Sequence, residues 1–209
     1  MPEDMGMSRP EKSHEIDQAA TGTSLDRYII NSTVSRFTVK VTAIGLLSAF
    51  GHSPTIAIRD MQGEVRFNPQ DIEGSALHFV VLADSLSVLD NVSDKDRREI
   101  EKEMRERVLE VSQYPQIIYE APRVSVKSTT NGQNDIVLLG QLTLHGATRS
   151  QPLPGKVSLT GDLLRAFGEF SLRQSDYNIK PVSAVGGALK VKDEVRLSYD
   201  IVARKAAES

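Results

Sequence analysis

Residues 140–149 read GQLTLHGATR, and this stretch carries the clearest strand signal in the chain. Leu142 and Leu144 alternate with polar residues, which is the period-two pattern of a strand with one buried face. Gly146 then permits a backbone conformation that bulkier residues rarely adopt. The stretch therefore predicts a β-hairpin whose two leucines face an apolar interior.

The same alternation recurs along most of the chain, and turn signals such as Asn131-Gly132 and Gly161-Asp162 separate its segments. The segments with strand patterns are residues 36–42, 56–59, 65–67, 77–83, 117–126, 136–144, 157–159, 168–173 and 195–203. Such a series with one helix favours an all-β fold, an antiparallel eight-stranded closed barrel. Two packed sheets have the same periodicity, so a sandwich remains an alternative.

One segment, residues 94–112, has the pattern of an amphipathic helix, and Ser93 is in place to cap its first turn. Its apolar positions, spaced by four, four and three, are Ile100, Met104, Val108 and Val111. Its other positions carry mixed charges that indicate a solvated face. Residues 77–83 are apolar on both faces, which predicts a strand covered from outside. We expect the helix to be that cover.

Composition excludes several classes of function. The 209 residues carry 25 Lys and Arg against 28 Asp and Glu, and a formal charge of -3 gives no electrostatic footprint for nucleic acid. Without cysteine there are no disulfides and no thiolate metal sites. No apolar run is long enough to span a membrane, and the N-terminus lacks the apolar core of a secretory signal, which predicts a cytoplasmic protein.

The chain divides into a polar tail and one domain. Residues 1–24 contain hardly any large apolar side chains, so we expect a disordered tail. Residues 25–205 then form a single barrel domain, a length common for all-β units. The sequence does not decide between a monomer and a homodimer.

Four separated blocks resemble one known family, the YceI-like, polyisoprenoid-binding proteins with lipocalin-like barrels. They are SRFTVKVTAIGLLSAFGHSPTIAIRDMQGEVRFNP at 35–69, DKDRREIEKEMRERVLEVSQYPQIIYEAPRV at 94–124, GQLTLHGATR at 140–149 and GEFSLRQSDYNI at 168–179. The resemblance spans residues 25–204 in the family's order. It implies a barrel with an elongated apolar cavity that holds a polyisoprenoid or another lipid-like chain. The family has no established catalytic residues, so we expect no enzyme and no cofactor.

Alternation and the resemblance together nominate ligand-binding residues. The apolar candidates, which share the inward faces of their strands, are Phe37, Val39, Leu77, Phe79, Val81, Leu142, Leu144, Phe170, Leu172 and Tyr199, with Val195 and Leu197 beside them. Arg149 and Tyr177 are candidates for contacting a head group at the mouth. Every apolar candidate is equally consistent with a filled core. A filled barrel that acts as a protein-interaction or stress-response module is therefore the alternative function.

The polar candidates favour structural roles. His52 and His145 each stand beside a glycine at a strand end, where an imidazole would bond a backbone carbonyl, and neither has partners at metal-ligand spacing. An isomerase or hydrolase that uses one of them is a third, weaker hypothesis. Salt bridges from Arg149 or Arg173 to Asp176 are favoured over contact with a ligand.

Overall fold

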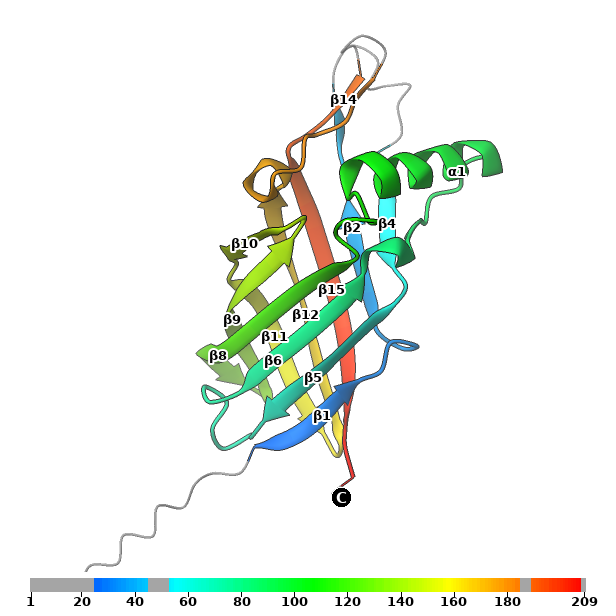
Figure 1. Ribbon diagram of the computed structural model, residues 1–209. Helices are drawn as coiled ribbons and strands as arrows, with labels where there is room; N and C mark the ends of the chain where they lie inside the picture. The colour runs from blue at the N-terminus through cyan, green and yellow to red at the C-terminus, as the bar shows by residue number, and fades with distance from the viewer. Residues whose placement is uncertain (1–24, 45–52, 185–188, 208–209) are drawn as a thin grey trace, which may run out of the picture.

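The computed structural model describes residues 25–44, 53–184 and 189–207, so the tail predicted at 1–24 and His52 lie outside the described residues. Its centre is an eight-stranded antiparallel ring (Figure 1). In spatial order the ring contains β1 (Asp26–Ile30), β5 (Met61–Phe67), β6 (Ala76–Leu82), β8 (Gln116–Thr130), β9 (Gln133–Leu144), β11 (Leu153–Thr160), β12 (Leu163–Arg173) and β15 (Glu194–Lys205). Pairing of β1 with β15 closes it. The predicted all-β, eight-stranded, lipocalin-like barrel is confirmed.

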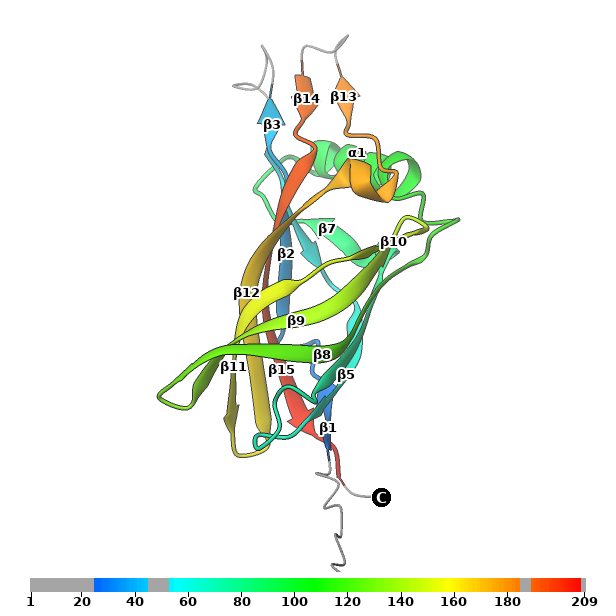
Figure 2. The ribbon, with the colours of Figure 1, turned by 90° about the vertical axis from the view of Figure 1, so that its left-hand side faces the viewer.

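Shorter strands lengthen the barrel wall toward one end. β2 (Arg36–Lys40) continues β1, β4 (Thr55–Ile58) precedes β5, and β7 (Leu86–Val88) follows β6. They pair in the order β15, β2, β4, β7. β10 (Ala147–Ser150) similarly pairs with the last part of β9, beyond the part that pairs with β11 (Figure 2). The barrel is consequently a tall tube rather than a short ring.

The last strand, β15, completes the closure. One of its edges pairs with β12 along eleven registered positions, and the other pairs first with β2 and then with β1. At the break between β1 and β2, the buried hydroxyl of Ser35 accepts a hydrogen bond from the backbone nitrogen of Val202 at 3.0 Å. Ser35 thus replaces a ladder bond where the two short strands are interrupted.

The hairpin predicted at 140–149 is present between β9 and β10. Its turn residues, His145 and Gly146, have φ angles of +49° and +73°. Asn131 and Gly132 between β8 and β9 have φ angles of +51° and +75°. Two successive positive φ angles define the type I′ turn, whose twist matches that of antiparallel strands.

The helical segment begins as predicted but lies elsewhere. α1 (Asp94–Glu103) is followed by a π-helical turn, η2 (Met104–Val108), and the Ser93 hydroxyl accepts from the Asp96 backbone nitrogen at 3.1 Å, which confirms the cap. The segment crosses the end of the barrel instead of covering residues 77–83 (Figure 1). On that strand His78 and Leu82 remain exposed. Periodicity identified the apolar face of the helix but could not identify what it packs against.

A small second sheet projects beyond the same end of the barrel (Figure 2). It contains β3 (Ala43–Ile44), β13 (Ser183–Ala184) and β14 (Leu189–Val191), with β14 in the middle. A short 3-10 helix, η3 (Gln174–Tyr177), follows β12 at this end. We refer to the described residues 40–44, 173–184 and 189–196 as the crown.

Candidate ligand-binding cavity

An apolar cavity of about 230 Å³ lies inside the barrel. It extends from Ile30 and Ile201 to the capped end, where Met104, Val108 and Ile179 face it. None of its described lining residues is charged, and polar side chains come only from Tyr119, Tyr199, Gln151 and Gln174. Burying an apolar surface against such walls is favourable, whereas a buried charge would have no partner. The cavity is therefore suited to an uncharged apolar molecule.

Ten of the twelve residues nominated from the sequence line this cavity. They are Phe37, Val39, Leu77, Phe79, Val81, Leu142, Leu144, Phe170, Leu172 and Tyr199, and Val195 and Leu197 line it as well. The other two, Arg149 and Tyr177, are not among the lining residues. Arg149 is exposed, whereas Tyr177 is 2% exposed within the segment that follows β12.

An aromatic cluster centred on Phe37 reduces the free space. Its ring centroid lies 6.0 Å from that of Phe79, 6.4 Å from that of Phe170 and 6.2 Å from that of Tyr199. All four side chains line the cavity. Rings at these separations attract one another beyond the effect of their buried area alone. The cluster accordingly occupies part of the tube that a long ligand would need.

The end of the barrel far from α1 is filled by side chains. Tyr28 and Phe67 meet there edge to face with centroids 6.1 Å apart, and neither lines the cavity. Val157, Leu164 and Ala203 are buried in the same way. The interior is thus solid at one end and hollow toward the other. Sequence alternation marks both sets of residues as inward-facing and cannot separate them.

Two tyrosine rings lie against inward-facing glycines, and their hydroxyl groups donate hydrogen bonds to backbone carbonyls. The Tyr199 hydroxyl donates to the Pro154 carbonyl at 2.9 Å, and the Tyr119 hydroxyl donates to the Gln151 carbonyl at 3.0 Å. A Cβ added at Gly155 or Gly168 would collide with the Tyr199 hydroxyl. These glycines therefore provide the space in which the ring lies. Sequence reasoning missed this role, although glycines within a strand pattern often mark such a close approach.

The buried tyrosines predict an alkaline limit of stability. Burial raises the pKa of Tyr199 to about 12 and also raises the pKa of Tyr119, from an ordinary value of 10.0. The folded state therefore favours the neutral phenol. The stability that comes from burying the neutral phenol is complete below pH ~10. It is lost as the pH rises toward 12. We expect the free energy of unfolding, measured in urea between pH 8 and 12, to fall by up to about 1.4 kcal/mol per pH unit for each tyrosine.

The Tyr199→Phe variant provides the control for this prediction. It cannot ionise, so its stability should decline less steeply above pH 10 than that of the wild-type protein. Equal slopes for the two proteins would show that Tyr199 does not contribute to the alkaline transition.

Polar contacts hold the capped end of the barrel together. The Gln174 side-chain nitrogen donates to the Lys192 carbonyl at 2.9 Å, which ties η3 to the segment that precedes β15. On the opposite side, His145 Nε2 lies 2.7 Å from Glu110 Oε2, and the His145 ring packs on Tyr114 with centroids 4.4 Å apart. The hairpin therefore anchors the chain just after η2, whose residues cap the cavity.

The predicted polar contacts are partly wrong. His145 does make a structural hydrogen bond, but its partner is the Glu110 carboxylate rather than a backbone carbonyl. It does not line the cavity. Among the described residues Arg149, Arg173 and Asp176 form no salt bridges with one another, and Arg149 donates to the Thr148 carbonyl at 3.0 Å. Contacts of this kind depend on the packing of distant segments, which strand patterns do not specify.

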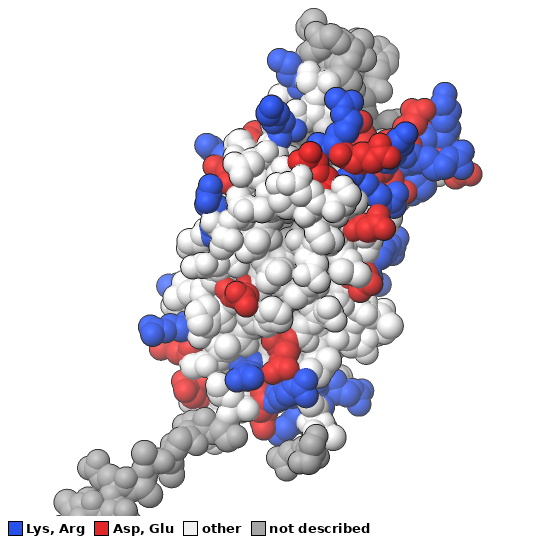
Figure 3. All heavy atoms as spheres, viewed as in Figure 1, with Lys and Arg blue, Asp and Glu red and all other residues white. Residues whose placement is uncertain are grey.

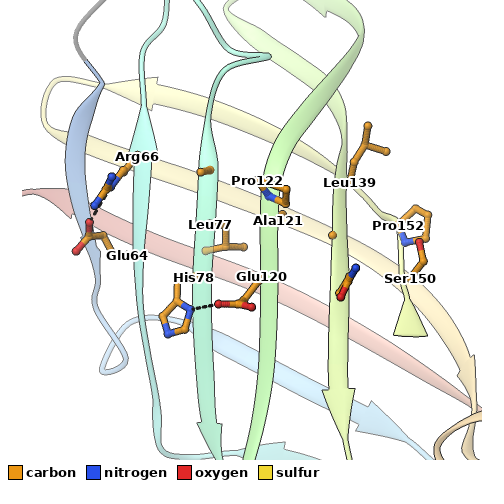
Figure 4. Close-up of a pocket in the computed structure, with 13 residues that line it drawn as sticks. Glu64, Arg66, Leu77, His78, Glu120, Ala121, Pro122, Leu139, Ser150 and Pro152 are labelled. Atoms are coloured by element: carbon orange, nitrogen blue, oxygen red, sulfur yellow. Dashed lines mark hydrogen bonds and ion pairs between the residues drawn. The ribbon is translucent and has the colours of Figure 1, made fainter. Parts of the chain in front are cut away.

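A second hollow lies on the outer face of β5, β6, β8 and β9 (Figure 4). His78 Nδ1 and Glu120 Oε1 are 3.2 Å apart there, and the two side chains are 56% and 68% exposed. Exposed ion pairs of this kind are weak and well solvated. No group of three or more potential metal ligands occurs in the described part of the chain. We therefore place the candidate site inside the barrel.

The described chain contains no helix with both the length and the apolar character needed to cross a bilayer. Its strands enclose an apolar cavity in a closed antiparallel barrel, which defines the class of lipocalin-like barrel proteins.

Comparison with known proteins identifies the family. The model of the YceI-like domain matches residues 28–203, and the chain belongs to the YceI-like family. No curated protein sequence matches it.

Three solved structures share the fold. BcnA of Burkholderia cenocepacia is 13% identical with a TM-score of 0.64, and the match covers 83% of this chain and 98% of BcnA. A polyisoprenoid-binding domain from Saccharophagus degradans, implicated in plant cell wall breakdown, is 13% identical with a TM-score of 0.61 and coverage of 87% and 99%. The YceI protein of Campylobacter jejuni is 12% identical with a TM-score of 0.52 and coverage of 73% and 85%.

Proposed function

We propose that this protein binds a long, uncharged, apolar molecule of the polyisoprenoid kind in the barrel cavity, and that it carries or stores this molecule without chemical change. The observation that carries the proposal is the uncharged lining of the cavity. The Saccharophagus degradans domain, described as polyisoprenoid-binding, supports the same chemical class.

The size of the cavity constrains how such a ligand binds. Its volume of about 230 Å³ is below the roughly 300–1,000 Å³ typical of small-molecule sites. A long chain therefore requires the Phe37 cluster or the η2 cap to move, or it leaves part of its length outside the barrel. Each methylene that becomes buried contributes about 0.8 kcal/mol before the costs of binding are subtracted.

The cavity offers few polar groups that could bind a head group. Among the described lining residues only Gln174 and Gln151 have amide side chains, and neither was nominated from the sequence. An amide can bond a hydroxyl or carbonyl but cannot neutralise a phosphate. The lining therefore favours a neutral alcohol or quinone-like head group over a charged one.

Retinol, a fluorescent isoprenoid alcohol, is a suitable probe for this proposal. We expect its fluorescence to rise on binding and linear isoprenoid alcohols to displace it with affinities that increase with chain length. Native mass spectrometry and solvent extraction of the protein purified from cells should recover an apolar molecule. An empty protein that also fails to bind retinol and any of the alcohols would refute the proposal.

A further inference from the structure

Basic side chains concentrate on the crown, the part of the molecule next to the capped end of the cavity. These segments contain six basic residues and only three acidic ones, Asp176, Asp193 and Glu194. The basic residues, all exposed, are Lys40, Arg173, Lys180, Lys190, Lys192 and Arg196. The whole chain has the opposite sign, with a formal charge of -3. Basic side chains are visible around the base of the crown, next to the mixed charges of α1 (Figure 3).

Acidic residues lie near one of the basic residues of the crown, because Arg173 stands opposite Glu194 across β12 and β15 and helps to lower the pKa of Asp193. None of the six forms a salt bridge within the described part of the molecule. Lys40 stands directly opposite Arg196 across β2 and β15, an arrangement that is unfavourable for like charges. The Asp193 carboxylate is bound by the Ser175 hydroxyl at 2.6 Å and by the Ser175 backbone nitrogen at 2.8 Å.

At the far end of the barrel some of the basic side chains are paired. Arg27 pairs with Glu64 at 2.6 Å, and Lys205 pairs with Asp26 at 2.8 Å. Ion pairing neutralises these cations within the protein, whereas the crown presents its positive charge outward. An external anionic surface would supply the missing partners.

The positive charge lies beside residues that line the capped end of the cavity. Val41 and Val195 line the cavity, and they directly adjoin Lys40 and Arg196 in the sequence. Ile44 on β3 is 36% exposed and adds an apolar side chain to the same crown. Cations next to an apolar side chain match the interface of a bilayer, where anionic head groups border the acyl chains.

We propose that the crown docks on an anionic membrane and brings the capped end of the cavity to the bilayer. This inference rests on the proposed function, because a bilayer is where a long apolar ligand is dissolved. Nucleic acid fits the crown less well, since Tyr177, the one aromatic residue of its described segments, is buried and offers no face for stacking.

Vesicle co-sedimentation tests this proposal. The protein is mixed with vesicles of phosphatidylcholine alone and of phosphatidylcholine with phosphatidylglycerol. Binding is expected only to the anionic vesicles, and it should weaken as the salt concentration increases. The triple variant Lys180→Gln, Lys190→Gln and Lys192→Gln should bind them on the order of a hundred-fold more weakly, about five-fold for each residue.

A matched control removes the same charge from elsewhere. Arg123, Lys127 and Arg204 lie toward the far end of the barrel and form no salt bridge in the described structure, so their replacement by Gln should leave vesicle binding nearly unchanged. Equal losses in the two triple variants would overturn the proposal, because they would reflect net charge alone. Absence of vesicle binding, or stronger binding to duplex DNA than to vesicles, would overturn it as well.

Retinol binding in solution separates the two proposals. The crown variant should bind retinol as the wild-type protein does, since none of its three replaced residues lines the cavity. A protein that binds anionic vesicles but not retinol or the isoprenoid alcohols would refute the ligand while retaining the docking surface.

Discussion

Gly155→Ala is expected to lower the free energy of unfolding by about 2–3 kcal/mol, and most of that cost should disappear in a Tyr199→Phe background. The added methyl group would collide with the Tyr199 hydroxyl, whereas the nearest carbon of that ring, Cζ, is 3.2 Å away. Removing the hydroxyl leaves only contacts of 3.0 Å or more, which small shifts relieve. Urea unfolding of the four proteins in the double-mutant cycle measures this coupling.

Gly168→Ala is the matched control for this cycle. Its added Cβ would also meet the Tyr199 hydroxyl at 2.7 Å, but its closest contact is the backbone carbonyl of Pro154. No side-chain replacement removes that carbonyl, so Tyr199→Phe should not rescue this variant. Tyr199→Phe alone should cost about 1 kcal/mol through the lost hydrogen bond. Additive effects of Gly155→Ala and Tyr199→Phe would contradict the packing described for the ring.

Val39→Phe is expected to weaken retinol binding roughly 50-fold. Val39 lines the cavity between Ile56 and Leu197 on the neighbouring strands, so a larger side chain takes space from the ligand. Displacing about three methylene groups of the ligand loses about 2.4 kcal/mol, which corresponds to that factor. Fluorescence titration measures the affinity, and thermal unfolding checks that the variant is folded.

Thr38→Phe is the corresponding control on the same strand. Successive side chains of a strand point to opposite faces, so Thr38 lies outside the cavity and should tolerate the larger ring without a loss of retinol affinity.

Phe37→Leu should act in the opposite direction to Val39→Phe, because it opens the aromatic cluster and should favour longer isoprenoid alcohols. Unchanged affinity in Val39→Phe would mean that retinol binds outside the barrel.

Strand alternation predicted the wall of the barrel well. The residues of β6, β9 and β15 that alternation assigns to the inward face line the cavity. This follows because side chains alternate with a period of two in any strand, whether its sheet forms a barrel or a sandwich. Local turn chemistry was equally informative, since Asn131-Gly132 adopts the turn that this pair favours and Gly146 has the positive φ angle that its glycine permits.

The missed features depend on packing between distant segments. Leu77 and Tyr28 are both inward-facing, yet one lines the cavity and the other fills the solid end, a difference set by the side chains around each. The location of α1 over the barrel end could not be read from its own amphipathic pattern. Gln174 looked unremarkable in the sequence because its neighbours, Lys192 and Asp193, belong to the other side of the crown.

Closure by β15 has a consequence for synthesis of the protein. The hydrogen bond between Val202 and Ser35 joins residues 167 positions apart. One edge of β1 and one edge of β2 pair with β15, so both edges stay unpaired until this final strand is made. At about 5–20 residues per second, a ribosome needs roughly 8–33 seconds to make the intervening chain. Throughout that interval the first strands have an unpaired edge, so the barrel must form after translation is essentially finished. A nascent chain stalled before residue 194 would therefore expose β12 and β2 as open edges to chaperones and to neighbouring chains.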